Sequence, residues 1–170
     1  MRRIAAARIA AALVLAFAIS GCGFKLRGAR TLPFPTIFLS AGGNSALGAE
    51  LARNIRVGTA TKVVPDRKEA AAVLDILAET RDREILSLNA QGRAREYTLR
   101  YRLSFKVHDG KGHDFIPATE IAVQRDISFN ESEVLAKESE EALLYRDMQT
   151  DLVQQILRRL AAAKADATQG

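Results

Sequence analysis

Cysteine, tryptophan and histidine are scarce in this chain, and their scarcity excludes several classes of protein. The 170 residues include one cysteine, no tryptophan and two histidines. A single cysteine cannot form an intramolecular disulfide, so apolar burial must stabilise the fold. The sequence also contains no Gly-x-Ser-x-Gly elbow and no phosphate-binding loop. We therefore expect a protein that is not an enzyme and that needs no cofactor.

Long hydrophobic runs are missing as well. The longest one extends over 11 residues, from Ile9 to Ile19, and follows the basic residues Arg2, Arg3 and Arg8. A membrane-spanning helix needs roughly 20 apolar residues. A basic start and a short apolar run are typical of an export signal, so residues 1–21 are predicted to be a cleaved signal peptide.

The excess of positive charge largely disappears with that segment. The full chain carries a formal charge of +5, and removing three arginines leaves 5 − 3 = +2 on the side chains of the mature part. Aromatic residues, which stack bases, make up only 6% of the chain. We therefore expect no nucleic-acid partner.

The only cysteine follows the apolar run directly, in the order Ile19-Ser20-Gly21-Cys22. Small residues before a cysteine fit the site of a signal peptidase, and a cysteine at a new N-terminus can carry acyl chains. The motif predicts lipidation at Cys22, and the alternative is a buried free thiol. Gly23 after the cysteine resembles a sorting signal for the outer membrane, so we expect the chain to be anchored in that membrane by its lipid.

The mature chain is predicted to consist of a tether and one domain. Residues 22–35, with Pro33 and Pro35, are interpreted as an extended lipidated tether. Residues 36–163 are expected to form a single α+β domain, and residues 164–170 a disordered tail. The expected strands are 36–40, 61–64, 73–88, 96–108 and 121–129, with 66–71 left undecided. One helix is expected over 46–57, with Asn44 or Ser45 as its N-cap and Gly58 as its C-terminal cap. A second, long helix is expected to reach about residue 163, with Asn130 and Glu133 as a capping pair at its start.

The clearest pattern is the strict alternation of apolar and polar residues from Glu96 to His108. Successive side chains of a strand point to opposite faces, so one face is buried and the other is polar. The turn 108–113 and the alternation that follows, broken only by Arg125, predict a long antiparallel hairpin. The fold expected is a two-layer sandwich with two helices packed on one face of a roughly four-stranded mixed or antiparallel sheet.

Two groups of residues are candidates for binding. His108, Asp109, His113 and Asp114 could ligate a metal, but the glycines between them favour a hairpin turn, so no metal site is expected. Several arginines and lysines lie in and beside the strands. Arg93 and Arg95 lie in a loop where no structural role requires them, and guanidinium groups suit an anionic lipid headgroup.

Five segments, in order, are similar to the LptE family of lipopolysaccharide-assembly lipoproteins. They are Cys22–Gly28, Glu96-Tyr97, Val134–Glu138, Tyr145–Met148 and Ile156–Leu160. The resemblance implies a lipoprotein of the outer membrane that lies on the periplasmic side and inside the lumen of the LptD β-barrel. There it would plug the barrel, help it assemble and bind lipopolysaccharide. The fold of that family agrees with the two-layer fold expected above.

The resemblance also implies where lipopolysaccharide binds. Lys137 matches the lysine of the family's Leu-Ala-Lys motif, whereas the loop position that is basic in the family falls near Ala90, so Arg93 or Arg95 would substitute for it. A different interpretation of the chain is a free periplasmic lipid-binding or transport-auxiliary lipoprotein. That class requires an apolar cavity left unfilled by the protein's own side chains.

Overall fold

The computed structural model describes residues 31–40, 45–130 and 134–163. The signal segment, Cys22, Asn44, Glu133 and the C-terminal tail lie outside them. The elements are, in chain order, β1 (Thr36–Leu39), α2 (Ala46–Gly58), β2 (Lys62–Val63), the short 3-10 helix η1 (Arg67–Glu69), β3 (Ala72–Leu88), β4 (Ala94–His108), β5 (Asp114–Ser128) and α3 (Val134–Ala162).

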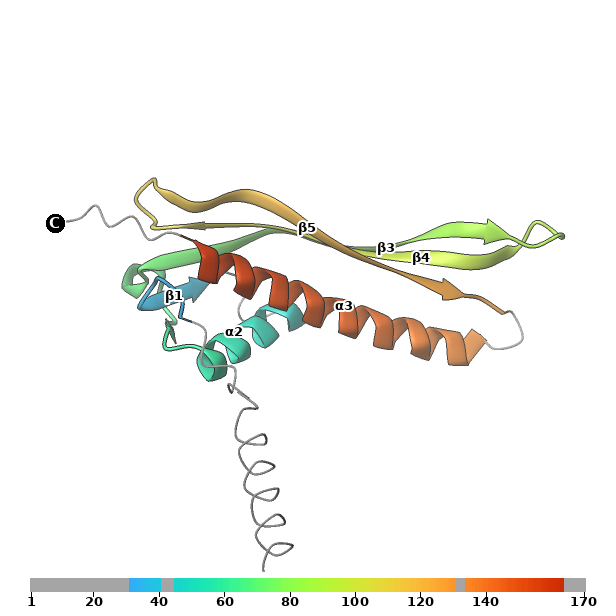
Figure 1. Cartoon of the computed structure of the whole chain (residues 1–170), viewed down its shortest axis with the longest axis horizontal. Coiled ribbons are helices and arrows are strands. Elements are labelled where there is room, and N and C mark those ends of the chain that lie inside the picture. The colour runs from blue at the N-terminus through green and yellow to red at the C-terminus, as the bar shows by residue number, and fades with distance from the viewer. Residues whose placement is uncertain (1–30, 41–44, 131–133, 164–170) are drawn as a thin grey trace, which may run out of the picture.

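The strands form one mixed sheet in the order β2-β1-β3-β4-β5. β1 is parallel to both β2 and β3, and the β3–β4 and β4–β5 pairs are antiparallel. Both helices lie on the same side of the sheet (Figure 1). The α+β two-layer prediction is confirmed, with five strands because the two-residue β2 adds to the edge beside β1.

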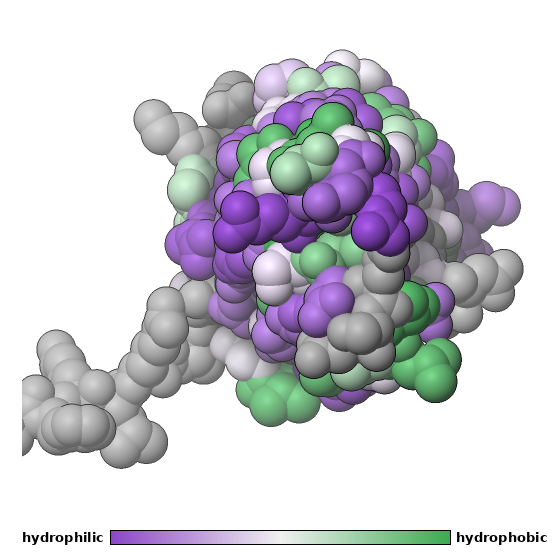
Figure 2. Space-filling model, turned by 90° about the vertical axis from the view of Figure 1, so that its right-hand side faces the viewer, coloured by the Kyte–Doolittle hydropathy of each residue, from purple (hydrophilic) through white to green (hydrophobic). Residues whose placement is uncertain are grey.

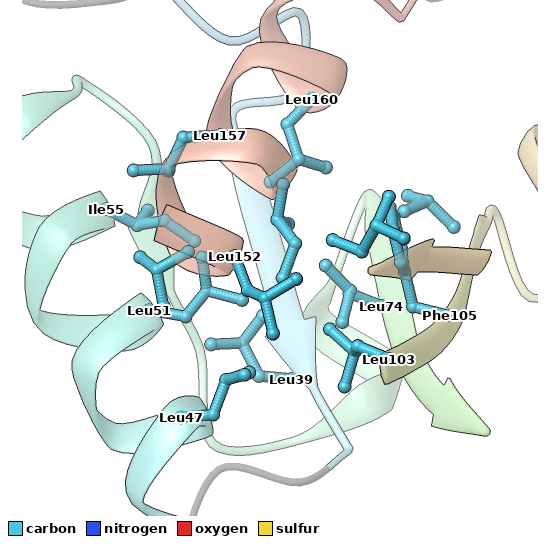
Figure 3. Packing of buried hydrophobic residues seen from close by; sticks show 14 of the residues in the cluster. Leu39, Leu47, Leu51, Ile55, Leu74, Leu103, Phe105, Leu152, Leu157 and Leu160 are labelled. Atoms are coloured by element: carbon cyan, nitrogen blue, oxygen red, sulfur yellow. The ribbon is translucent and has the colours of Figure 1, made fainter. Parts of the chain in front are cut away.

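The core lies between this face of the sheet and the helices (Figure 3). α2 contributes Leu47, Leu51 and Ile55, spaced by four residues so that they share one face of the helix. α3 contributes an equivalent stripe, and the sheet contributes the apolar half of β4. All the alternating apolar residues of β4 from Leu99 to Val107 are fully buried. Burying each such side chain stabilises the fold by about 1.5–3 kcal/mol.

The start of α2 follows the sequence prediction, and its end differs in one detail. Ser45 is the N-cap, and its Oγ accepts a hydrogen bond from the backbone N–H of Gly48 at 3.3 Å. Gly58 is the last helical residue, and Thr59 follows it in extended conformation. The Thr59 N–H and hydroxyl both donate to the Ile55 carbonyl, which replaces a glycine cap.

A β-bulge changes which residues of β3 face the helices. Ile76 pairs with Phe105 on the helix side, but the register shifts between Ile76 and Ala78. Strict alternation would place Ala78 on the same face as Ile76, but after the shift Ala78 lies on the opposite face, opposite Ser104. Beyond the bulge it is Glu79, Arg81 and Arg83 that face the helices, as shown by their partners Leu103, Tyr101 and Leu99 on β4.

β5 is longer than predicted, and the structure accounts for Arg125, the residue that breaks its alternation. It begins at Asp114, seven residues before Ile121, and Pro117 lies within it, which an edge strand tolerates. Arg125 occupies an inward position, opposite Leu99, and donates to Asp151 of α3 at 2.5 Å. The exception to the pattern is thus an ion pair between the sheet edge and the long helix.

The folded domain reaches back before Thr36. Leu32 and Phe34 are only 6% and 3% exposed and belong to the core, and the Phe34 ring contacts Phe115 with centroids 4.7 Å apart. Residues 31–35 were assigned to the tether because their prolines favour extended backbone. The backbone there can be extended and still bury alternate side chains.

The sheet is much longer than its short first strands. β1 pairs with β3 only at Ala72–Leu74, so the rest of β3 forms a three-stranded ribbon with β4 and β5. The β3–β4 hairpin extends beyond the start of α3 (Figure 1). We use "distal end" for the residues gathered there: the hairpin 85–97, the end of β5 with Phe129, and the first turns of α3 (134–143).

Candidate functional site

The turn between β3 and β4 holds the first two predicted binding residues. Asn89 organises this turn: its side-chain Oδ1 accepts from the backbone N–H groups of Gln91 and Arg93 at 3.0 and 2.9 Å. Gly92 has a φ of 75°, which favours glycine. Arg93 ends this turn, whereas Arg95, expected in the loop, is the second residue of β4, and both side chains are exposed.

Lys137, the third predicted residue, lies at the same end on α3. Its Nζ donates to Glu140 Oε2 at 2.8 Å and to Ser128 Oγ at 3.2 Å, and its side chain is 15% exposed. The residue after Ser128, Phe129, donates its N–H to the carbonyl of Arg95 at 2.7 Å. Lys137 and Arg95 therefore lie near the same strand end, although Lys137 is paired with an acid of its own helix.

Two arginines within the strands, Arg100 and Arg102, do not join this site. On the uncovered face of the sheet, Arg100 pairs with Glu84 at 2.5 Å and Arg102 pairs with Asp82 at 2.7 Å. These are cross-strand pairs between β3 and β4, in which each cation is compensated by an acid. Arg100 and Arg102 are therefore held by acids of the neighbouring strand.

A polar network that the sequence did not reveal connects the sheet to both helices. The Tyr101 hydroxyl donates to Glu79 at 2.5 Å and accepts from Arg81 at 2.8 Å. Arg81 also donates to Gln149 of α3 at 3.1 Å, and Gln149 donates to Glu50 of α2 at 2.6 Å. Burial, followed by the hydrogen bond to Glu79, raises the pKa of Tyr101 to about 12.

This network follows from the bulge in β3. Two residues of the helix-facing side, Glu79 and Arg81, are charged, and they are satisfied by groups from β4 and both helices. The sequence offers one hint of this network: Gln149 is a polar residue beside the apolar stripe of the long helix. Its partner Glu50 lies 99 residues away, so the pairing could not be inferred from the sequence. Among the described residues no buried side-chain nitrogen or oxygen lacks a partner.

The residues considered for a metal site have structural roles around the turn. His108 Nδ1 accepts from the N–H of Gly110 at 2.9 Å, so Nε2 carries the proton and donates to Asp75 at 2.8 Å. Asp109 Oδ1 accepts from the N–H groups of Lys111 and His113. In the described part of the chain no three metal-ligating residues are grouped.

The Asp75 carboxyl joins this turn to the neighbouring segment. It also pairs with Arg67 at 2.5 Å. Burial alone would raise the pKa of Asp75, but the hydrogen bond from His108 and the charge of Arg67 outweigh it and hold the pKa below its ordinary value of 3.8. The arrangement fixes the hairpin turn against η1.

The groove that described residues form between β5 and α3 does not resemble a cavity for acyl chains. One groove of about 470 Å³ lies between β5 and α3 and is lined by charged and amide side chains, among them Arg125, Asp151 and Gln155. The apolar stripe of α3 is fully buried against the sheet at Leu152, Ile156 and Leu160. These observations do not favour the alternative of a free periplasmic lipid-binding or transport-auxiliary lipoprotein.

The described helices offer no membrane span. None of them, over residues 45–130 and 134–163, is both long enough and apolar enough to cross a bilayer.

Comparisons with known proteins agree with this geometry. The sequence profile of LptE, described as lipopolysaccharide-assembly, matches residues 34–160. The chain is 28% identical over 149 residues to an LPS-assembly lipoprotein LptE of Yersinia pestis, covering 86% of this chain and 71% of the relative. Among solved structures it is similar to a lipoprotein B of Nitrosomonas europaea, with 38% identity and a TM-score of 0.72 over 82% of this chain and 91% of that chain. The rare lipoprotein B of Shewanella oneidensis, at 24% identity and a TM-score of 0.62 over 75% of this chain and 94% of that one, shares the fold.

Proposed function

Because the chain belongs to the LptE family of lipopolysaccharide-assembly lipoproteins, we propose that it is a non-enzymatic partner of an LptD-type β-barrel in the outer membrane. In this proposal it plugs the barrel, assists its assembly and binds lipopolysaccharide on its way to the outer leaflet. It is held at the membrane by acyl chains on Cys22.

The uncovered face of the sheet is the observation that carries this proposal. It extends along the β3, β4 and β5 ribbon, and neither helix covers it (Figure 1). Its charges are paired between strands, by Arg102 with Asp82 and Arg100 with Glu84, and Thr98 donates to Asp126 at 2.7 Å. The interior of a large barrel is polar. A face with compensated charges can enter such an interior without leaving buried charges unpaired, which would be costly.

The lipid anchor complements this surface. Leu32, the first core residue in the described part of the chain, lies only ten positions after Cys22 in the sequence. Even a fully extended segment of ten residues spans at most about 35 Å. The folded domain would thus stay within reach of the bilayer that holds the acyl chains, where a barrel is also found.

Lipopolysaccharide is proposed to bind at the distal end through Arg93, Arg95 and Lys137. Lipid A is an anionic amphiphile, and guanidinium groups bind phosphate through paired hydrogen bonds. Arg93 is exposed on the turn ordered by Asn89, Arg95 is exposed at the start of β4, and Lys137 reaches the adjoining strand end. The salt bridge of Lys137 with Glu140 would have to open, or be shared, for that lysine to contact a phosphate.

A triple variant tests the lipopolysaccharide site. Arg93→Ala, Arg95→Ala and Lys137→Ala together should weaken capture by immobilised lipopolysaccharide at least tenfold, because charge-assisted hydrogen bonds contribute about 1.5–3 kcal/mol each. Co-purification with the barrel should remain unchanged. The matched control removes three exposed cations elsewhere, Arg53→Ala, Arg56→Ala and Lys62→Ala, on α2 and β2.

The controls decide what the result means. If the triple variant and the control variant bind lipopolysaccharide equally well, the distal site is wrong. If both lose binding to the same extent, the attraction is a non-specific effect of net charge and the site is equally wrong. Loss of barrel co-purification by the triple variant alone would instead assign these residues to the protein interface.

A further inference from the structure

Exposed apolar side chains are concentrated at the distal end. Eight large hydrophobic residues are exposed in the described part of the chain, and six of them lie within 85–88 and 134–143. The group on the hairpin is Ile85, Leu86 and Leu88, which are 58%, 54% and 57% exposed. Single exposed leucines are common on protein surfaces, but three exposed aliphatic side chains in four residues at one strand end, here called the patch, favour a contact with a ligand or partner.

The strand register places this patch beside the cations. Leu88 pairs with Ala94, which lies between Arg93 and Arg95 in the chain, and Ile85 pairs with Tyr97. Apolar and cationic side chains therefore lie within a few positions of each other on one hairpin. Figure 2, which views the molecule from this end, shows hydrophobic side chains exposed among hydrophilic ones.

The helices do not reach the tip of this hairpin, which extends past the start of α3 (Figure 1). An ion pair between α3 and β3 joins Glu141 to Arg83, two residues before Ile85. The turn is nevertheless ordered, since Asn89 N–H donates to the Arg93 carbonyl at 2.8 Å and Gly92 N–H donates to the Asn89 carbonyl at 3.0 Å. The patch is thus presented on a preorganised support, which lowers the entropic cost of binding.

Cations next to exposed leucines match one ligand chemistry, an anionic group attached to hydrocarbon. We propose that the hairpin binds the acyl chains of lipopolysaccharide through Leu86 and Leu88 while Arg93 and Arg95 bind its phosphates. This inference rests on the lipopolysaccharide binding proposed above and adds to it a second, apolar half of the site. A site of cations alone would bind the phosphorylated sugars equally well after the acyl chains had been removed.

Two ligands and two variants separate the halves of the site. Capture of the processed full-length chain would be measured on immobilised intact lipopolysaccharide and on lipopolysaccharide stripped of its acyl chains. Leu86→Ser with Leu88→Ser is the test variant. Val57→Ser with Leu77→Ser is the matched control, because both residues carry exposed aliphatic side chains outside the distal end. Circular dichroism melting confirms that each variant folds.

The wild-type chain should bind intact lipopolysaccharide at least about tenfold more tightly than the stripped form. The stripped form lacks the acyl chains that the two half-exposed leucines would contact. The Leu86 and Leu88 variant should lose most of that difference and keep its binding to the stripped form, while the control variant keeps both. Unchanged binding of intact lipopolysaccharide by the leucine variant overturns the inference but leaves the cationic site standing.

Two further outcomes would also overturn the inference. If the wild-type chain binds neither ligand, the proposed lipopolysaccharide binding itself is wrong, and the apolar half of the site is wrong with it. If the leucine variant keeps its affinity for lipopolysaccharide but no longer co-purifies with the barrel, the patch is a protein contact rather than a lipid contact.

Discussion

Replacing Tyr101 by phenylalanine removes one oxygen from the polar network and leaves the aromatic ring in the core. The tyrosine is fully buried, and its hydroxyl makes two hydrogen bonds, to Glu79 and from Arg81. Hydrogen bonds to charged groups contribute about 1.5–3 kcal/mol. Glu79 and Arg81 keep other partners, Ser45 and Gln149, so we expect a loss of about 2 kcal/mol, less than two fully lost bonds of this kind would cost.

Chemical denaturation measures this loss directly, and a melting curve should show it as a decrease of about 8 °C, because 1 kcal/mol corresponds to about 4 °C for a domain of this size. The matched control is Tyr97→Phe, which makes the same chemical change where the described residues offer the hydroxyl no partner. Equal stability of the Tyr101 variant and the wild type, or an equal loss in the control, would refute the assigned role of the network.

The pH dependence provides a second test of the same network. The pKa of Tyr101 is raised to about 12, above the ordinary value of 10, so the folded state holds this proton more tightly than the unfolded state does. The corresponding stability is fully present below pH 10 and is lost as the pH rises towards 12. The difference in unfolding free energy between the wild type and Tyr101→Phe should therefore shrink over that interval, and a constant difference would contradict the raised pKa.

Three other predictions follow from the structure. Phe34→Ala should destabilise the domain by about 3–5 kcal/mol in urea denaturation, whereas a segment that is only a tether would tolerate the change. The lowered pKa of Asp75 supplies stability that is present above pH 3.8 and lost as the pH falls below it. Asp75→Asn keeps a partner for His108 but cannot titrate, so its unfolding free energy should fall less steeply than that of the wild type on acidification. An equally steep fall in both proteins would contradict this. Arg100→Glu with Arg102→Glu should reduce barrel co-purification while costing little stability, because exposed ion pairs contribute about 0–1 kcal/mol each; full recovery of the barrel would argue against docking by this face.

The parts of the fold that could be predicted are those set by local periodicity. The alternation from Glu96 to His108 and the four-residue stripe of α3 depend on geometry repeated along one element. The position of each apolar residue on β4 followed from that alone. The Ser45 cap was equally local, since its side chain satisfies a donor three residues away.

The parts that could not be predicted depend on contacts between distant residues. The bulge at Leu77 reverses the faces of β3, and only the pairing with β4 reveals it. Arg125 broke the alternation because its partner, Asp151, lies on another element. For the binding site, the sequence indicated Arg93, Arg95 and Lys137, but it could not show that Lys137 is paired with Glu140 or that exposed leucines lie beside the arginines.

Mass spectrometry of the chain extracted from native membranes tests the central proposal most directly, because one spectrum reports both the N-terminal residue and any bound protein. We expect a mature chain that begins at an acylated Cys22 and leaves the membrane attached to an LptD-type barrel. A chain that is recovered without acyl chains, as a soluble monomer with no barrel, would contradict the proposal.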